Sequence, residues 1–208
     1  MSAGLFLFVF LPLRRRGRGD LPRFGLWLLY FCCIGVAFIF VEISLMQRFA
    51  LFLGHPARSL ALVLACLLIF AGIGSQMKQR WNIPLGWAMP ALIAAILVAA
   101  FAYPWCVQQM LGLPLWLRGC LTVAMVAPVA FFMGMPFPFG IRSVSEKSQD
   151  AVPWMWGVNG GATVLGSIAA IACAITFNFT TVLVFAALAY ATALASHLLL
   201  ARTRGILQ

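Results

Sequence analysis

Six apolar runs restrict this chain to one fold class. A hydrocarbon core about 30 Å thick needs about 20 apolar residues in a helix, and lipid offers no hydrogen-bond partner to an exposed backbone. The runs show no strand-like alternation, and 64% of all residues are hydrophobic, well above the share in soluble domains. We therefore predict an all-α, polytopic membrane helix bundle within the lipid bilayer, with six full spans at residues 25–46, 57–75, 83–103, 115–134, 154–175 and 180–200.

A shorter apolar segment precedes these runs. Residues 4–13 would form a helix only about 15 Å long, half the thickness of the hydrocarbon core. We therefore predict a partial or interfacial helix there rather than a seventh span. The chain then divides into residues 1–24, a short apolar segment with a basic loop, and residues 25–208, a six-helix transmembrane domain.

Basic residues are distributed unevenly between the spans. Of the 14 Lys and Arg residues, three (Arg48, Arg58 and Arg118) fall on one side of the membrane, which leaves eleven on the other. The positive-inside rule places the richer side in the cytoplasm, and six crossings return the C-terminus to that side. The net charge of +10 therefore reflects membrane topology, and we expect no nucleic-acid partner.

Glu42 is an acidic residue within an apolar run, about one turn from the outer end of its predicted span. An ionisable group inside a membrane helix is costly, and it usually faces a polar partner or a water-filled cavity. One interpretation is a site that binds a small cation or handles a proton. The other is a structural carboxylate near the interface, either neutral or paired with Arg48, Arg58, His55 or a donor on another helix. Gln47, Arg48 and His55 are therefore candidate members of a polar site or anchor.

Two stretches interrupt the helical pattern. Residues 49–53 are too apolar for a free loop and are followed by a Gly-His-Pro break, so we predict a segment that lies in the outer interface or folds back. Residues 134–140 contain two glycines and two prolines. A broken helix of this kind can line a binding site, but we favour a plain helix exit because water near the loop can satisfy the backbone.

Small residues recur near the start of the fifth run. Gly157 and Gly161 form a GxxxG pair that Ala162 and Gly166 extend, and such spacing lets helices approach closely in membranes. We predict that this face packs against another helix. Asn159 lies among these glycines, where its amide could hydrogen-bond across the bundle or contact a ligand, and we favour the packing role.

Residues that could support catalysis are scarce. Four residues are acidic, and three of them, Asp20, Glu146 and Asp150, lie in basic segments. No nucleophile–base pair or metal-ligand spacing is visible, so we expect no catalytic residues, no metal and no cofactor. Cys106 and Cys120 flank one outer loop, where a disulfide is an alternative to two free thiols.

Three stretches resemble a known family. They are FVEISLMQRFALFLGHPARSLALVLACLLIFAGIGS (40–75), FFMGMPFPFGIR (131–142) and VPWMWGVNGGATVLGS (152–167). They resemble the membrane domain of bacterial spermidine synthase-like membrane proteins, in which a helix bundle is joined to a soluble synthase-like domain. The resemblance implies a multi-pass protein of the bacterial inner membrane. No Gly-rich nucleotide fingerprint follows a strand, so we expect neither the soluble domain nor aminopropyl transfer in this chain.

Three functions follow from these observations. We favour a non-catalytic accessory or structural subunit that docks in a larger membrane complex, either an energy-transducing complex or a partner synthase. The first alternative is a transporter-like or ligand-binding bundle for a small cation such as a polyamine, with Glu42 as the counter-charge. The second alternative is the membrane half of a split spermidine synthase-like enzyme.

Overall fold

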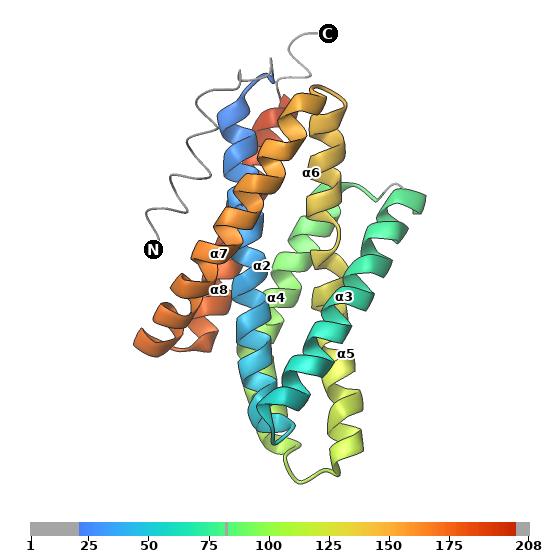
Figure 1. The fold of residues 1–208 in the computed structure, drawn as a ribbon. Coiled ribbons are helices and arrows are strands. Elements are labelled where there is room, and N and C mark those ends of the chain that lie inside the picture. The colour runs from blue at the N-terminus through green and yellow to red at the C-terminus, as the bar shows by residue number, and fades with distance from the viewer. Residues whose placement is uncertain (1–20, 82, 203–208) are drawn as a thin grey trace.

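A computed structural model describes residues 21–81 and 83–202, and this part of the chain is a bundle of α-helices (Figure 1). Six segments within it are long and apolar enough to cross a membrane, with α5 and α6 forming one of them together. The predicted all-α membrane bundle is confirmed, whereas the partial helix predicted at residues 4–13 lies outside the described residues. The helices are α2 (Phe24–Phe52), α3 (Pro56–Trp81), α4 (Leu85–Gln109), α5 (Leu115–Met133), α6 (Pro136–Ser145), α7 (Val152–Thr176) and α8 (Phe179–Arg202), with a 3-10 turn, η1 (Gln149–Ala151), before α7.

α2 lies at the centre of the bundle and packs against α8, α7 and α3 (Figure 1). Apolar residues occupy all sides of this helix, as expected for a helix that other helices surround. α4 packs on α8 and α5 packs on α3, which completes the bundle. Fully buried side chains of α2 include Tyr30, Phe31, Leu45, Phe49 and Phe52.

The first span is longer than the sequence pattern predicted. α2 continues to Phe52, and both Phe49 and Phe52 are fully buried, whereas Leu51 is 82% exposed. The predicted interfacial or folded-back segment at residues 49–53 is therefore wrong, because these apolar residues belong to the end of the helix. Gly54 makes the turn into α3 with a φ of 71°, a left-handed conformation that favours glycine.

α3 and α5 touch backbone to backbone where they cross. A Cβ atom on Gly74 would overlap the carbonyl oxygen of Phe131, and one on Gly134 would overlap the carbonyl oxygen of Ala71. Glycine at both positions permits an approach that any side chain would block. The crossing fixes the end of α5 against α3 at the point where the chain bends.

The bend after α5 does not end the span. α6 starts at Pro136, in the first helical turn, where a missing N–H costs little, and it continues to Ser145. The predicted plain helix exit is therefore wrong, and a broken helix crosses this part of the bundle. Tyr30 on α2 donates a 2.8 Å hydrogen bond to the carbonyl of Pro136, which holds the start of α6 against the central helix.

Successive spans run in opposite directions, so the segments that connect them lie at the two ends of the bundle (Figure 1). Lys78, Arg80, Arg142 and Lys147 lie at the end where α2 begins, called the basic end below. The opposite end contains Arg48, Arg58 and Arg118. That the basic end faces the cytoplasm stays a prediction from the distribution of charge.

Candidate functional site

Arg48 connects α2 to two other helices. Its Nη1 donates hydrogen bonds to the carbonyl oxygens of Ala99 at 2.8 Å and Ala100 at 3.2 Å, and its Nη2 donates to the Thr180 hydroxyl at 2.6 Å. In an unbroken helix the Ala100 carbonyl would accept from residue 104, but Pro104 has no N–H. The guanidinium supplies the missing donor, so Arg48 ties α2 to α4 and α8.

The end of α2 is tied to its neighbours in a similar way. Arg118 at the start of α5 donates a 2.8 Å hydrogen bond to the carbonyl of Phe52, the last residue of α2. The hydroxyl of Ser59 on α3 donates to the carbonyl of Met46 at 2.6 Å. A cation at a helix C-terminus meets unpaired carbonyls and the negative end of the helix dipole. Arg118 therefore stabilises the end of the central helix.

Glu42 lies deeper in its span than the sequence pattern predicted. Because α2 extends to Phe52, ten residues separate Glu42 from the helix end, a distance of about 15 Å rather than one turn. The side chain is half-buried. Among residues 21–81 and 83–202, no hydrogen bond or ion pair to its carboxylate is found. The alternative of an ion pair with Arg48, Arg58 or His55 is not realised in this part of the chain, where Arg48 and His55 bond elsewhere.

Gln47 and His55 do not join Glu42 in a common site. Both side chains are exposed at the end of the bundle opposite the basic end. His55 Nδ1 accepts a 3.2 Å hydrogen bond from the N–H of Ala57 and so satisfies a donor in the first turn of α3. The polar residues that cluster in the sequence between positions 42 and 55 are therefore distributed over separate surfaces.

Asn159 bridges α7 to the central helix. Its Nδ2 donates a 3.0 Å hydrogen bond to the carbonyl of Phe31, and the Thr163 hydroxyl donates to the backbone carbonyl of Asn159 at 2.9 Å. A Cβ on Gly35 would lie only 2.7 Å from that same carbonyl oxygen, so α2 needs a glycine at this contact. The predicted packing role of Asn159 matches this geometry.

The glycines of α7 divide between two faces. Gly166 contacts α2, since its Cβ would lie 2.8 Å from Ile39 Cγ2, and Ala162 lies against Gly35. A Cβ on Gly157 or Gly161 would meet nothing within 4 Å in the described part of the chain. Within this part, close packing is therefore found for Ala162 and Gly166 and not for the Gly157–Gly161 pair, whose packing stays a prediction. Successive helical residues point about 100° apart, so the pair Gly157 and Gly161 and the pair Ala162 and Gly166 point in different directions from the helix.

An apolar groove of about 580 Å³ runs between α3 and α7. α2 contributes Ile34 and Phe38 to it, and the bend at Gly134 lies at its border. Two of its polar side chains, those of Asn159 and Thr163, donate hydrogen bonds to backbone carbonyls of the protein. The rims are open: Leu68 is 72% exposed and Trp156 is 58% exposed. The groove is therefore open to the apolar acyl chains of the surrounding bilayer.

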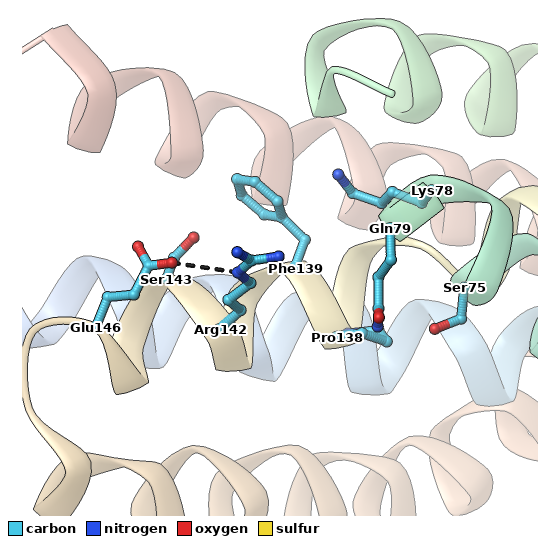
Figure 2. Close-up of a pocket in the computed structure, with 8 residues that line it drawn as sticks. All are labelled: Ser75, Lys78, Gln79, Pro138, Phe139, Arg142, Ser143 and Glu146. Carbon is cyan, nitrogen blue, oxygen red and sulfur yellow. Dashed lines mark hydrogen bonds and ion pairs between the residues drawn. The ribbon is translucent and has the colours of Figure 1, made fainter. Parts of the chain in front are cut away.

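A polar cavity of about 360 Å³ adjoins the groove at the basic end. Lys78 lies with its Nζ 4.5 Å from the ring centroid of Phe139, and Arg142 Nε lies 3.2 Å from Glu146 Oε1. Figure 2 shows that these side chains come from the end of α3 and from α6. The lining residues are Ser75, Lys78, Gln79, Pro138, Phe139, Arg142, Ser143 and Glu146, of which Ser75 and Pro138 also line the groove.

Sequence reasoning missed this polar cavity because it assigned residues after 134 to a helix exit. The available signal was the spacing of Arg142, Ser143 and Glu146, which places polar side chains on one face of a short helix. The other wall of the cavity, which includes Lys78 of α3, comes from a distant part of the sequence. Only the bend between α5 and α6 brings the two together.

Groups that could hold a metal do not gather in the described residues. No set of three His, Cys, Asp or Glu side chains lies in a metal-binding arrangement within residues 21–81 and 83–202. Cys106 and Cys120 are both free, so the alternative of a disulfide between them is not realised.

Comparison with protein-family models, curated proteins and solved structures found no match for this chain. Its function must therefore be argued from its own residues and contacts.

Proposed function

We propose that this chain is a non-catalytic integral membrane protein that docks, through the outward face of α7, against a transmembrane helix of another membrane protein. The observation that carries this proposal is the group of Gly157, Gly160 and Gly161. An added Cβ at any of the three would meet nothing within 4 Å in the described part of the chain. Gly157 and Gly160 are exposed, and Gly161 is partly exposed.

Glycines on an outward helix face have a cost that contact with lipid does not offset. Each glycine in a helix interior costs about 1 kcal/mol relative to alanine. Small residues let a second helix approach to backbone contact, and this packing drives helix association in membranes. α7 is also the least covered span among the described residues: 17% of its most apolar window is buried, against 22% to 44% in the others. These features support a partner helix on this face.

Two classes of partner fit the proposal. One is a subunit of an energy-transducing complex, and the other is a protein with a soluble synthase-like domain. The resemblance of residues 40–75, 131–142 and 152–167 to spermidine synthase-like membrane proteins favours the second class. Such a partner would make this chain the membrane half of a divided protein, located in the bacterial inner membrane.

The test is purification of the full chain from native membranes in lipid nanodiscs, followed by mass determination of the complex. We expect one other membrane protein at fixed stoichiometry with the wild-type chain. Gly157→Leu combined with Gly161→Leu should remove it, because two large side chains would separate the helix backbones. The matched control is Gly86→Leu on α4, which also fills open space. A monodisperse monomer, or a partner that the double variant retains, would contradict the proposal.

A second candidate function is binding of a small cation such as a polyamine by Glu42. The observation that favours it is the position of this carboxylate, about 15 Å inside the end of α2, with no ion pair to any described residue. An unpaired charge at such depth is costly, and a bound cation would offset that cost. Phe38 lines the apolar groove one helical turn before Glu42, so the carboxylate lies on the same side of α2 as the groove.

Calorimetric titration of the purified chain with spermidine tests this candidate. Glu42→Gln keeps the size of the side chain and removes its charge, so we expect affinity to fall at least about 10-fold. Glu146→Gln is the matched control, because its carboxylate is exposed and already pairs with Arg142. Equal affinity of the wild type and Glu42→Gln removes Glu42 from any such function.

A further inference from the structure

Two cationic side chains line the polar cavity, and both keep donors that the described residues do not use. Lys78 donates a 2.9 Å hydrogen bond to the carbonyl of Ile83, which leaves two N–H groups on its ammonium. Arg142 bonds Glu146 through Nε, and its terminal nitrogens bond to no residue in 21–81 or 83–202. Paired N–H groups of this kind match phosphate oxygens. The neutral groups around them belong to Ser75, Gln79 and Ser143 (Figure 2).

The apolar groove adjoins this cationic cavity. Ser75 and Pro138 line both spaces, so the groove and the cavity meet at these two residues. Leu68 on α3 and Trp156 on α7 form exposed rims of the groove. A molecule with an anionic head and an apolar tail would find complementary surfaces in this order along the membrane normal.

The groove and the polar cavity together match one leaflet of a bilayer in length. Along α3 the lining residues extend from Leu67 in the groove to Lys78 in the polar cavity. The eleven helical steps between these two residues correspond to about 16 Å of helix. One leaflet of a hydrocarbon core about 30 Å thick measures about 15 Å. An acyl chain of a membrane lipid therefore fits the groove when its headgroup lies at Lys78.

We propose that the polar cavity and the apolar groove together bind one anionic phospholipid from the leaflet at the basic end. The headgroup phosphate lies between Lys78 and Arg142, and an acyl chain lies along the groove toward Leu67. Basic pockets between transmembrane helices are a recognised setting for anionic headgroups. A soluble anion would leave the groove unused, and a zwitterionic lipid would bring its one positive group close to Lys78 and Arg142.

Native mass spectrometry of the purified full chain with added lipids tests the proposal. Phosphatidylglycerol and phosphatidylcholine with identical acyl chains are titrated in separate experiments. We expect phosphatidylglycerol to bind at least about 10-fold more tightly, equivalent to about 1.4 kcal/mol. Lys78→Gln combined with Arg142→Gln should abolish this preference. Arg80→Gln combined with Lys147→Gln removes the same charge at the same end, outside the cavity, and should retain it.

A third variant tests the groove separately from the charges. Gly72 lines the groove, and an added side chain there meets open space, so Gly72→Leu should fill the groove without disturbing the fold. We expect it to weaken phosphatidylglycerol binding at least about 5-fold while circular dichroism stays unchanged. This variant and the comparison of lipids remain decisive even if the charge variant fails to fold.

Three results would overturn the proposal. The first is equal binding of the two lipids by the wild type. The second is an equal effect of the two charge-removing pairs on phosphatidylglycerol binding. The third is displacement of the lipid by millimolar inorganic phosphate combined with unchanged binding by Gly72→Leu, which would assign the cavity to a soluble anion.

Discussion

The guanidinium of Arg48 donates a hydrogen bond to the carbonyl oxygen of Ala100, the oxygen that a proline four residues later leaves without a backbone donor. The two residues lie on neighbouring helices, α2 and α4. Burying a carbonyl in a membrane without a donor costs several kcal/mol, so the arginine lets α4 keep Pro104 within its span. Arg48, which the sequence pattern places among the basic residues between the spans, is thus a structural part of the bundle.

Arg48→Leu should destabilise the bundle by about 1.5–3 kcal/mol, because hydrogen bonds from a charged group to α4 and α8 are lost. The cost should be smaller in a Pro104→Ala background, where residue 104 regains an N–H for the Ala100 carbonyl. Denaturant unfolding in micelles, followed by circular dichroism, measures both values. Arg58→Leu is the control, since Arg58 is exposed. Equal costs of Arg48→Leu in the two backgrounds would show that the proline is irrelevant.

Gly74→Ala should destabilise the crossing of α3 and α5. The added methyl group would overlap the carbonyl of Phe131, and overpacking of this kind costs about 1–3 kcal/mol. Gly72→Ala on the same helix places its methyl group in open space and should be neutral or slightly stabilising. The same unfolding measurement compares the two variants. A neutral Gly74→Ala would mean that the helices do not touch here.

Gly35→Ala should destabilise the contact between α2 and α7 more than Asn159→Ala does. Asn159→Ala removes one bond to Phe31, which in membranes costs about 0.6 kcal/mol. The Cβ of Gly35→Ala would lie 2.7 Å from the Asn159 carbonyl oxygen, an overlap that costs about 1–3 kcal/mol. Gly157→Ala, in open space, provides the baseline. The reverse order of the Gly35 and Asn159 effects would show that the hydrogen bond, and not the close approach, determines this contact.

Labelling of single cysteines should place the basic end in the cytoplasm. In a variant without its native cysteines, Gly112→Cys lies in the turn between α4 and α5, and Gln149→Cys lies at the basic end. We expect a membrane-impermeant maleimide to label Gly112→Cys in intact spheroplasts and Gln149→Cys only after lysis. Labelling of Gln149→Cys before lysis, without labelling of Gly112→Cys, would reverse the orientation.

The limits of sequence reasoning are clearest at the two helix breaks. Hydropathy located all six spans, yet it ended the first too early because the aromatic residues at positions 49 and 52 follow Gln47 and Arg48. It also ended the fourth span at Gly134, whereas α6 resumes at Pro136. A proline can stop a helix or start one, and the neighbours that hold the new helix decide which.

The sequence by itself determined that this chain is a membrane helix bundle with six spans, because lipid admits only helices or closed barrels and each span needs a fixed apolar length. Tertiary structure decided what the polar residues and glycines do. On α7, Gly166 packs against α2 whereas Gly157 and Gly161 do not, and Lys78 meets α6 only because the span breaks at Gly134. Such relations depend on helix rotation and crossing, which apolar composition leaves open.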